Sequence, residues 1–120
     1  MPRPSHKELN TKIKQGKALI AADLLDIVNP VSFAADAIDL NYAIEDLRGI
    51  LSSLLDEIRP AHYVGHRPPQ RSYERKITGT ELFAFQWEST LLQCEVYLKF
   101  ALYDDRLWLV SLHKSKKKRG

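Results

Sequence analysis

The sequence contains a single cysteine, Cys94, and therefore cannot form an internal disulfide. It has no apolar run near the roughly 20 residues that a membrane-spanning helix needs. Its first residues also lack the apolar core of a secretory signal. These absences remove any requirement for an oxidising compartment or a bilayer. We expect a cytoplasmic protein with no membrane partner.

Sequence motifs for metals and common cofactors are missing as well. The four histidines and Cys94 show no recognised zinc spacing. His62 and His66 are four residues apart, but proline and glycine in the same segment argue against the helix that would align them. The chain has neither a glycine-rich phosphate loop nor a serine or cysteine nucleophile motif. We therefore expect no metal and no cofactor, and we interpret Cys94 as a small core residue.

The net charge of +3 conceals a strong asymmetry along the chain. Residues 1–20 carry five basic groups against one acidic group, and residues 58–120 carry twelve against six. Residues 21–57 carry eight carboxylates against one arginine. If the two basic flanks meet in the fold, they form a positive face that attracts nucleic acid. The alternative is that these charges are scattered and only solvate the surface.

Helical patterns fill the first half of the chain. Residues 6–27 have apolar positions on one side and lysines on the others, which predicts a helix. Asn29 and Pro30 suit the end of that helix and the start of the next. Over 33–58, apolar residues recur three and four positions apart, which predicts one core helix. Asn41 is the position at which this element could divide in two.

Strand patterns fill the second half, after a proline-rich loop over 59–72. Alternating apolar residues predict three strands, over 81–87, 93–103 and 106–113, of which the last two form a hairpin. The predicted fold is a single domain over 1–120 of the α+β class, with N-terminal helices packed on one face of a small antiparallel sheet. The charged ends, residues 1–5 and 115–120, are expected to be mobile.

Alternation along the strands assigns side chains to the two faces of this sheet. Along the second predicted strand, Tyr97 and Lys99 point away from the apolar core. The last predicted strand has one side with Leu107, Leu109 and Ser111 and another with Trp108, Val110 and Leu112. His113, near its end, is expected on the same face as Tyr97.

Tyr97, Lys99 and His113 are the types of group that metal-free cleavage of RNA requires. RNA supplies its own nucleophile, the 2′-hydroxyl, so the protein must move protons and balance charge at phosphorus. Histidine and tyrosine transfer protons, and lysine and arginine neutralise charge. The basic residues that could bind the RNA backbone are Arg67, Arg71, Arg75, Lys76, Lys114 and Lys116.

Ordinary structural roles also explain these three residues. An outward tyrosine is common on strands because of its β-propensity. Lys99 could simply solvate the sheet, and His113 could be an ordinary residue at a strand end. From the residues alone, non-catalytic binding of RNA or protein is favoured over catalysis.

The last two predicted strands resemble the terminal hairpin of a known toxin family. The segment from Val96 to Lys99 is similar to the V-Y-L-K strand of MqsR-type toxins, and the segment from Leu109 to Lys114 is similar to their closing V-S-F-K strand. Upstream, residues 39–42 resemble their G-L-D-F segment, and residues 85–87 resemble their W-Q strand. These toxins belong to the RelE-like mRNA interferase superfamily.

This resemblance implies a RelE-like fold and a function. The chain would be the toxin of a type II toxin–antitoxin pair, a metal-independent endoribonuclease that cleaves mRNA. Its partners would be mRNA and a cognate antitoxin protein, and involvement of the ribosome is left open. By position, Tyr97 matches the active-site tyrosine of the family, and Gln86 matches a glutamine of the site. His113 falls where the family has a lysine, with Lys114 one position further on.

The sequence departs from the family at one further position. A family lysine that follows the central helix has no clear match, although Arg59, Arg71 or Arg75 could replace it. Two alternatives therefore stay open. The chain could be a non-catalytic RNA- or protein-binding module of the same fold, or a RelE-like toxin that acts on a protein target such as gyrase.

Overall fold

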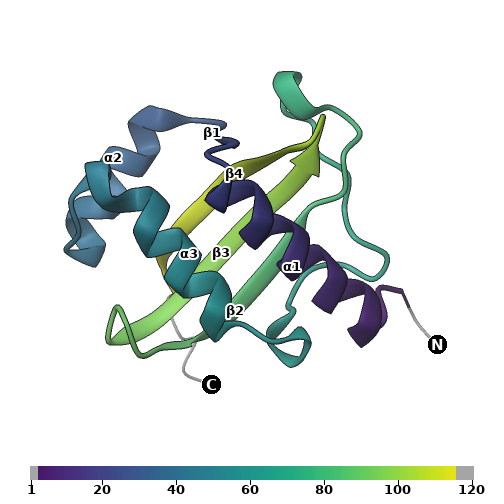
Figure 1. Cartoon of the computed structure of the whole chain (residues 1–120), viewed down its shortest axis with the longest axis horizontal. Coiled ribbons are helices and arrows are strands. Elements are labelled where there is room, and N and C mark those ends of the chain that lie inside the picture. The colour runs from purple at the N-terminus through teal and green to yellow at the C-terminus, as the bar shows by residue number, and fades with distance from the viewer. Residues whose placement is uncertain (1–2, 116–120) are drawn as a thin grey trace.

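The structure is a computed structural model that describes residues 3–115. Its elements in chain order are α1 (His6–Ala21), β1 (Leu25–Ile27), α2 (Pro30–Leu40), η1 (Ile44–Asp46), α3 (Leu47–Glu57), η2 (Pro60–His62), η3 (Arg75–Ile77), β2 (Phe83–Ser89), β3 (Cys94–Tyr103) and β4 (Arg106–Lys114). The strands form one sheet in the order β1-β4-β3-β2, with β1 parallel to β4 and the other pairs antiparallel. The three α-helices lie on one face of this sheet (Figure 1), which confirms the predicted α+β class. The prediction of a purely antiparallel sheet is wrong, because the short strand β1 adds a parallel pair with β4.

The segment after the first helix differs from the prediction of a helix over 6–27. Helix α1 ends at Ala21, and Leu25–Ile27 instead form the short strand β1 alongside β4. Asp23 has a positive φ of 62°, which turns the chain out of the helix. Because the partner strand lies far along the sequence, this pairing overrides the local helical pattern. An ion pair between Asp26 and Arg106 further joins β1 to β4.

The apolar segment over 33–58 is two helices, so the prediction of one continuous helix is wrong and the alternative of a break at Asn41 is confirmed. Helix α2 ends at Leu40, and Asn41 adopts the left-handed conformation with φ 62° and ψ 49°. Asparagine tolerates this conformation at a helix C-terminus. Helix α3 then begins at Leu47 and packs beside α1. Pro30 occupies the first turn of α2, as predicted.

The core lies between the helices and the inner face of the sheet. Phe85, Leu98 and Phe100 on the strands, and Leu51 and Leu54 on α3, are all fully buried. Their burial removes apolar area from water and is the main stabilising contribution to the fold. The opposite face of the sheet, which we call the outer face, is not covered by a helix (Figure 1).

A β-bulge in β4 changes which residues of that strand share a face. Leu109 pairs with Phe100 and Ser111 pairs with Lys99, so Val110 is an extra residue between them. Ser111 therefore lies on the outer face, and Leu112 lies in the core with no exposed surface. The predicted sides of Ser111 and Leu112 are wrong because strict alternation cannot foresee the extra residue.

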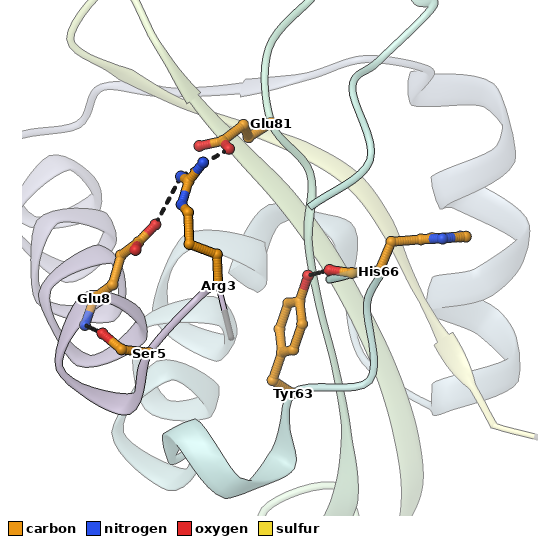
Figure 2. Close-up of polar contacts among 6 residues, drawn as sticks. All are labelled: Arg3, Ser5, Glu8, Tyr63, His66 and Glu81. Carbon is orange, nitrogen blue, oxygen red and sulfur yellow. Dashed lines mark hydrogen bonds and ion pairs between the residues drawn. The ribbon is translucent and has the colours of Figure 1, made fainter. Parts of the chain in front are cut away.

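The N-terminal residues are joined to the rest of the domain by polar contacts. Figure 2 shows the Arg3 guanidinium between Glu8 and Glu81, at 3.0 Å from a carboxylate oxygen of each. The Ser5 hydroxyl accepts a hydrogen bond from the Glu8 backbone N–H at 3.1 Å and caps α1. At the other end, the Ser115 N–H donates to the Glu95 carbonyl at 2.9 Å. Parts of both predicted mobile ends thus contact the folded domain.

A carboxylate at the end of α3 is hydrogen-bonded to the far edge of the sheet. Glu57 accepts from the Trp87 indole N–H at 2.9 Å and from the Leu91 backbone N–H at 2.8 Å. Burial by itself would raise the pKa of Glu57, but these hydrogen bonds to the charged form outweigh it and lower the pKa.

We expect Glu57→Gln to remove a stabilising contribution that depends on pH. Because the folded-state pKa is depressed, the contribution is present above pH 4.5, the ordinary value of a glutamate carboxyl, and is lost as the pH falls through the folded-state pKa. Urea unfolding at pH 7 and at pH 3 should show a larger difference for the wild type than for the variant. Glu88→Gln, at an exposed position on β2, is the control, and an equal effect of both variants would contradict the prediction.

Within residues 3–115, no helix combines the length and the hydropathy that crossing a bilayer would require.

Candidate functional site on the outer face of the sheet

Three predicted site residues form one row across the outer face. In the strand register, Gln86 of β2 lies opposite Tyr97 of β3, and Tyr97 lies opposite His113 of β4. Residues directly opposite each other in a sheet have side chains roughly 5 Å apart on the same face. The Tyr97 and His113 rings are stacked, with centroids 5.1 Å apart and an interplanar angle of 21°. The structure therefore brings the predicted tyrosine, histidine and glutamine together.

The neighbouring row adds the predicted lysine. Lys99 lies between Ala84 on β2 and Ser111 on β4. Its ammonium group lies 5.7 Å from the centre of the Tyr97 ring. An aromatic hydroxyl, an imidazole and an ammonium group thus meet on a face that no helix covers. All three side chains are partly exposed, so a ligand in solution can reach them.

The β4 bulge is what places His113 in this group. Leu107 and Leu109 point into the core, and strict alternation from Leu109 would carry His113 to the core side as well. The extra residue, Val110, reverses the alternation and puts His113 on the outer face. Bulges commonly redirect a side chain beside a functional site.

A hydrogen bond orients the His113 ring. Its Nδ1 lies 3.1 Å from the backbone carbonyl oxygen of Lys114. Because a carbonyl oxygen can only accept, this bond requires a hydrogen on Nδ1. In the neutral imidazole Nε2 then keeps its lone pair and can take up a proton.

Two carboxylates beside the row were not among the predicted site residues. Glu88 and Glu95 lie directly opposite each other in the next row of the outer face. The Glu95 carboxylate accepts a hydrogen bond from the Gln86 side-chain amide at 3.1 Å, which orients Gln86. Because Glu95 is two residues before Tyr97 on the same strand, simple alternation is the sequence signal that could have placed it on this face.

The loop between α3 and β2 approaches the outer face. Part of the 59–72 segment, predicted as irregular, forms single bridges with the strand region, at Tyr63 with Phe85 and at Arg71 with Glu81. The Tyr63 hydroxyl donates to the His66 carbonyl within the loop (Figure 2). Burial raises the pKa of this hydroxyl, which keeps it protonated as a donor.

The predicted RNA-binding residues are dispersed. Arg67 lies over the Tyr63 ring, 5.1 Å from its centre. The Arg71 guanidinium donates to the Gly79 carbonyl at 3.1 Å, which makes it a structural contact of the loop. Arg75 and Lys76 are exposed in η3. Lys116 lies outside the described residues.

The structure separates Lys114 from His113. In the register Lys114 lies opposite Val96, which is buried on the helix side of the sheet. Successive strand residues point to opposite faces, so Lys114 cannot share the outer face with His113. Lys114, which is predicted to bind the RNA backbone, therefore does not lie on the face that carries His113.

Among residues 3–115, the basic residues of α1 do not join the basic residues of the outer face. Helix α1 packs on the helix side of the sheet, away from the outer face (Figure 1). Lys12 lies 5.9 Å from the centre of the Phe83 ring, and Lys17 forms an ion pair with Asp56. The outer-face row therefore has Lys99 as its neighbouring cation, with Glu88 and Glu95 as nearby opposite charges.

Metal-binding groups are not assembled in the described part of the chain. No cluster of three or more histidine, cysteine, aspartate or glutamate side chains there could hold an ion. Cys94 is partly buried against the core, and burial raises the pKa of its thiol, which disfavours the reactive thiolate.

In comparisons with known proteins, no family model and no curated protein matches the sequence.

Proposed function

We propose that this chain is a metal-independent endoribonuclease that cleaves mRNA on the outer face of its sheet. The observation that carries the proposal is the stacked pair of Tyr97 and His113, with the Lys99 ammonium group beside it. Two groups that can transfer protons and one fixed cation are what 2′-hydroxyl attack on a phosphodiester requires.

In the proposed reaction, His113 acts as the base and Tyr97 as the acid. Nε2 of His113 takes the proton from the 2′-hydroxyl, and the 2′-oxygen forms a bond to phosphorus. The bond between phosphorus and the 5′-oxygen breaks, and the Tyr97 hydroxyl gives that oxygen its proton. The products are a 2′,3′-cyclic phosphate and a free 5′-hydroxyl. Solvent then restores the proton to Tyr97 and removes it from His113.

Lys99 and Gln86 would stabilise the reacting phosphate without moving protons. The Lys99 ammonium group balances the negative charge that develops on the phosphorane oxygens. The Gln86 amide is oriented by Glu95 and can donate a second hydrogen to a phosphate or ribose oxygen. Their positions in adjacent rows allow both to address one phosphate.

We further propose that this chain is the toxin of a toxin–antitoxin pair. Its support is the resemblance of the hairpin over 96–114 to MqsR-type toxins, because this hairpin carries Tyr97, Lys99 and His113. A toxin of this kind requires a cognate antitoxin, which would cover the outer face and block access of RNA.

The decisive experiment is incubation of the purified protein with a short RNA in the presence of EDTA. We expect cleavage with cyclic-phosphate ends, and no cleavage of DNA of the same sequence, which lacks the 2′-hydroxyl. A double variant, Tyr97→Phe with His113→Ala, should leave the RNA intact. Intact RNA with the wild-type protein, or equal cleavage by the double variant, would refute the nuclease proposal.

A second candidate function is protein binding without catalysis. Its support is the Glu88 and Glu95 pair, which places negative charge next to the position proposed for a phosphate. Induced expression of this protein in growing cells distinguishes the two candidate functions. A nuclease toxin arrests growth and degrades mRNA, whereas a binding module does neither. Arrest with intact RNA would instead favour a toxin that acts on a protein.

A further inference from the structure

A loop arches over the outer face beside the candidate site. The Val64 N–H donates to the Ala84 carbonyl at 2.9 Å, and the Leu82 N–H donates to the Gln70 carbonyl at 2.8 Å. One end of the loop is therefore hydrogen-bonded to β2, and the other to Leu82, the residue that precedes β2. Between them the loop and the sheet line a partly open hollow of about 180 Å³.

The hollow adjoins the residues proposed to act on phosphate. Ala84, Tyr97 and Lys99 all line it. Ala84 lies directly opposite Lys99 on the outer face, and only 4% of its surface is exposed because the loop covers it. Its small side chain leaves the space open. A group held in the hollow would therefore lie within one row of the Tyr97 ring.

The shape of the loop is set before any ligand binds. Gly65 passes so close to Tyr63 that a Cβ there would lie 2.6 Å from the Tyr63 hydroxyl oxygen. That hydroxyl donates to the His66 carbonyl, and Figure 2 shows the His66 side chain extending away from the Tyr63 ring. A preformed site avoids the entropic cost of ordering a loop on binding.

We propose that this hollow binds one unpaired nucleobase of the RNA, next to the phosphate that Lys99 neutralises. The inference rests on the proposed function. The hollow is smaller than the roughly 300–1,000 Å³ of pockets for drug-sized ligands, so it suits a single planar ring system.

Polar side chains of the lining can identify the base. Gln70 and His66 both border the hollow and are exposed. Single-stranded RNA is commonly read by stacking on rings such as histidine and by hydrogen bonds to base edges. A glutamine amide matches adenine, because it offers a donor and an acceptor together. The hollow therefore favours RNA with adenine beside the cleaved bond.

The test maps cleavage sites in a mixed-sequence RNA. We expect the wild type to cut beside adenine, and Gln70→Ala to lose roughly ten-fold or more of that preference. Ala84→Val, which fills the hollow, should do the same. Ala35→Val, at an exposed position on the helix side, is the matched control and should cut as the wild type does. The Gln70 change leaves its backbone bond to Leu82 in place, so it does not disturb the fold.

A binding measurement separates this inference from the nuclease proposal. Adenosine 3′-monophosphate is titrated while backbone NMR signals of Gly65 and Ala84 are followed. RNA cleavage without base preference, and without shifts of these signals, would overturn the nucleobase site and leave the nuclease proposal standing. Shifts that Ala84→Val abolishes, without RNA cleavage, would support nucleotide binding in the hollow and refute catalysis. If the NMR signals do not shift and the RNA is not cleaved, both the nucleobase site and the nuclease proposal are overturned.

Discussion

Replacing His113 by alanine is expected to slow RNA cleavage by about 10²–10⁴-fold, the range typical of a lost proton-transfer group. The His113 ring stacks on Tyr97, and its Nδ1 lies within hydrogen-bond distance of the Lys114 carbonyl. Alanine removes Nε2 and leaves the backbone pairing with Tyr97 unchanged. Initial cleavage rates of one short RNA, measured in EDTA, give the ratio directly.

A matched histidine variant controls for general effects on the protein. His6→Ala changes an exposed histidine at the start of α1, on the helix side of the sheet, and should retain full activity. Tyr97→Phe removes only the hydroxyl and keeps the aromatic ring, so it tests the proposed acid separately. If the two site residues act as a unit, the double variant should be little slower than either single one. Full activity of His113→Ala would refute its role as the base.

Three of the four strands, and the pairing of β3 with β4, could be predicted from the sequence because their signals are local. Alternation over 93–103 and 106–113, with only two residues between these ranges, was sufficient to predict the β3–β4 hairpin. Strand β1 was not predictable in this way. Three residues are too few to show a period, and β1 exists because it pairs with β4, some 80 residues further along the chain.

The candidate site could be predicted only in part, for a similar reason. Tyr97 and Lys99 share a face by simple alternation along one strand, so their proximity follows from the sequence. The position of His113 depends on the bulge at Val110, and no local residue pattern had indicated that bulge. The hollow under the 63–70 loop depends on contacts with β2 that are distant in sequence, so it could not be foreseen.

Phe100→Ala is expected to lower the free energy of unfolding by about 3–5 kcal/mol, the usual cost of removing a buried aromatic ring. Phe100 has no exposed surface, and its ring centroid lies 6.0 Å from those of both Phe83 and Phe85. Its other side is close to α1, where a Cβ on Gly16 would come within 3.8 Å of the ring. This loss is large compared with the total free energy of unfolding of a typical domain, which is roughly 5–15 kcal/mol.

Denaturant unfolding followed by tryptophan fluorescence measures this loss, with Tyr103→Ala as the matched control. Tyr103 ends the same strand but is 48% exposed, so its removal should change the free energy of unfolding much less.

Phe100 also follows Lys99 at the bulge, on the opposite face of the sheet. Where the variant is still folded, the outer-face row should stay in register and cleave RNA at close to the wild-type rate. A loss below about 1 kcal/mol would mean that the ring does not occupy the centre of the core, since even small deletions there cost that much.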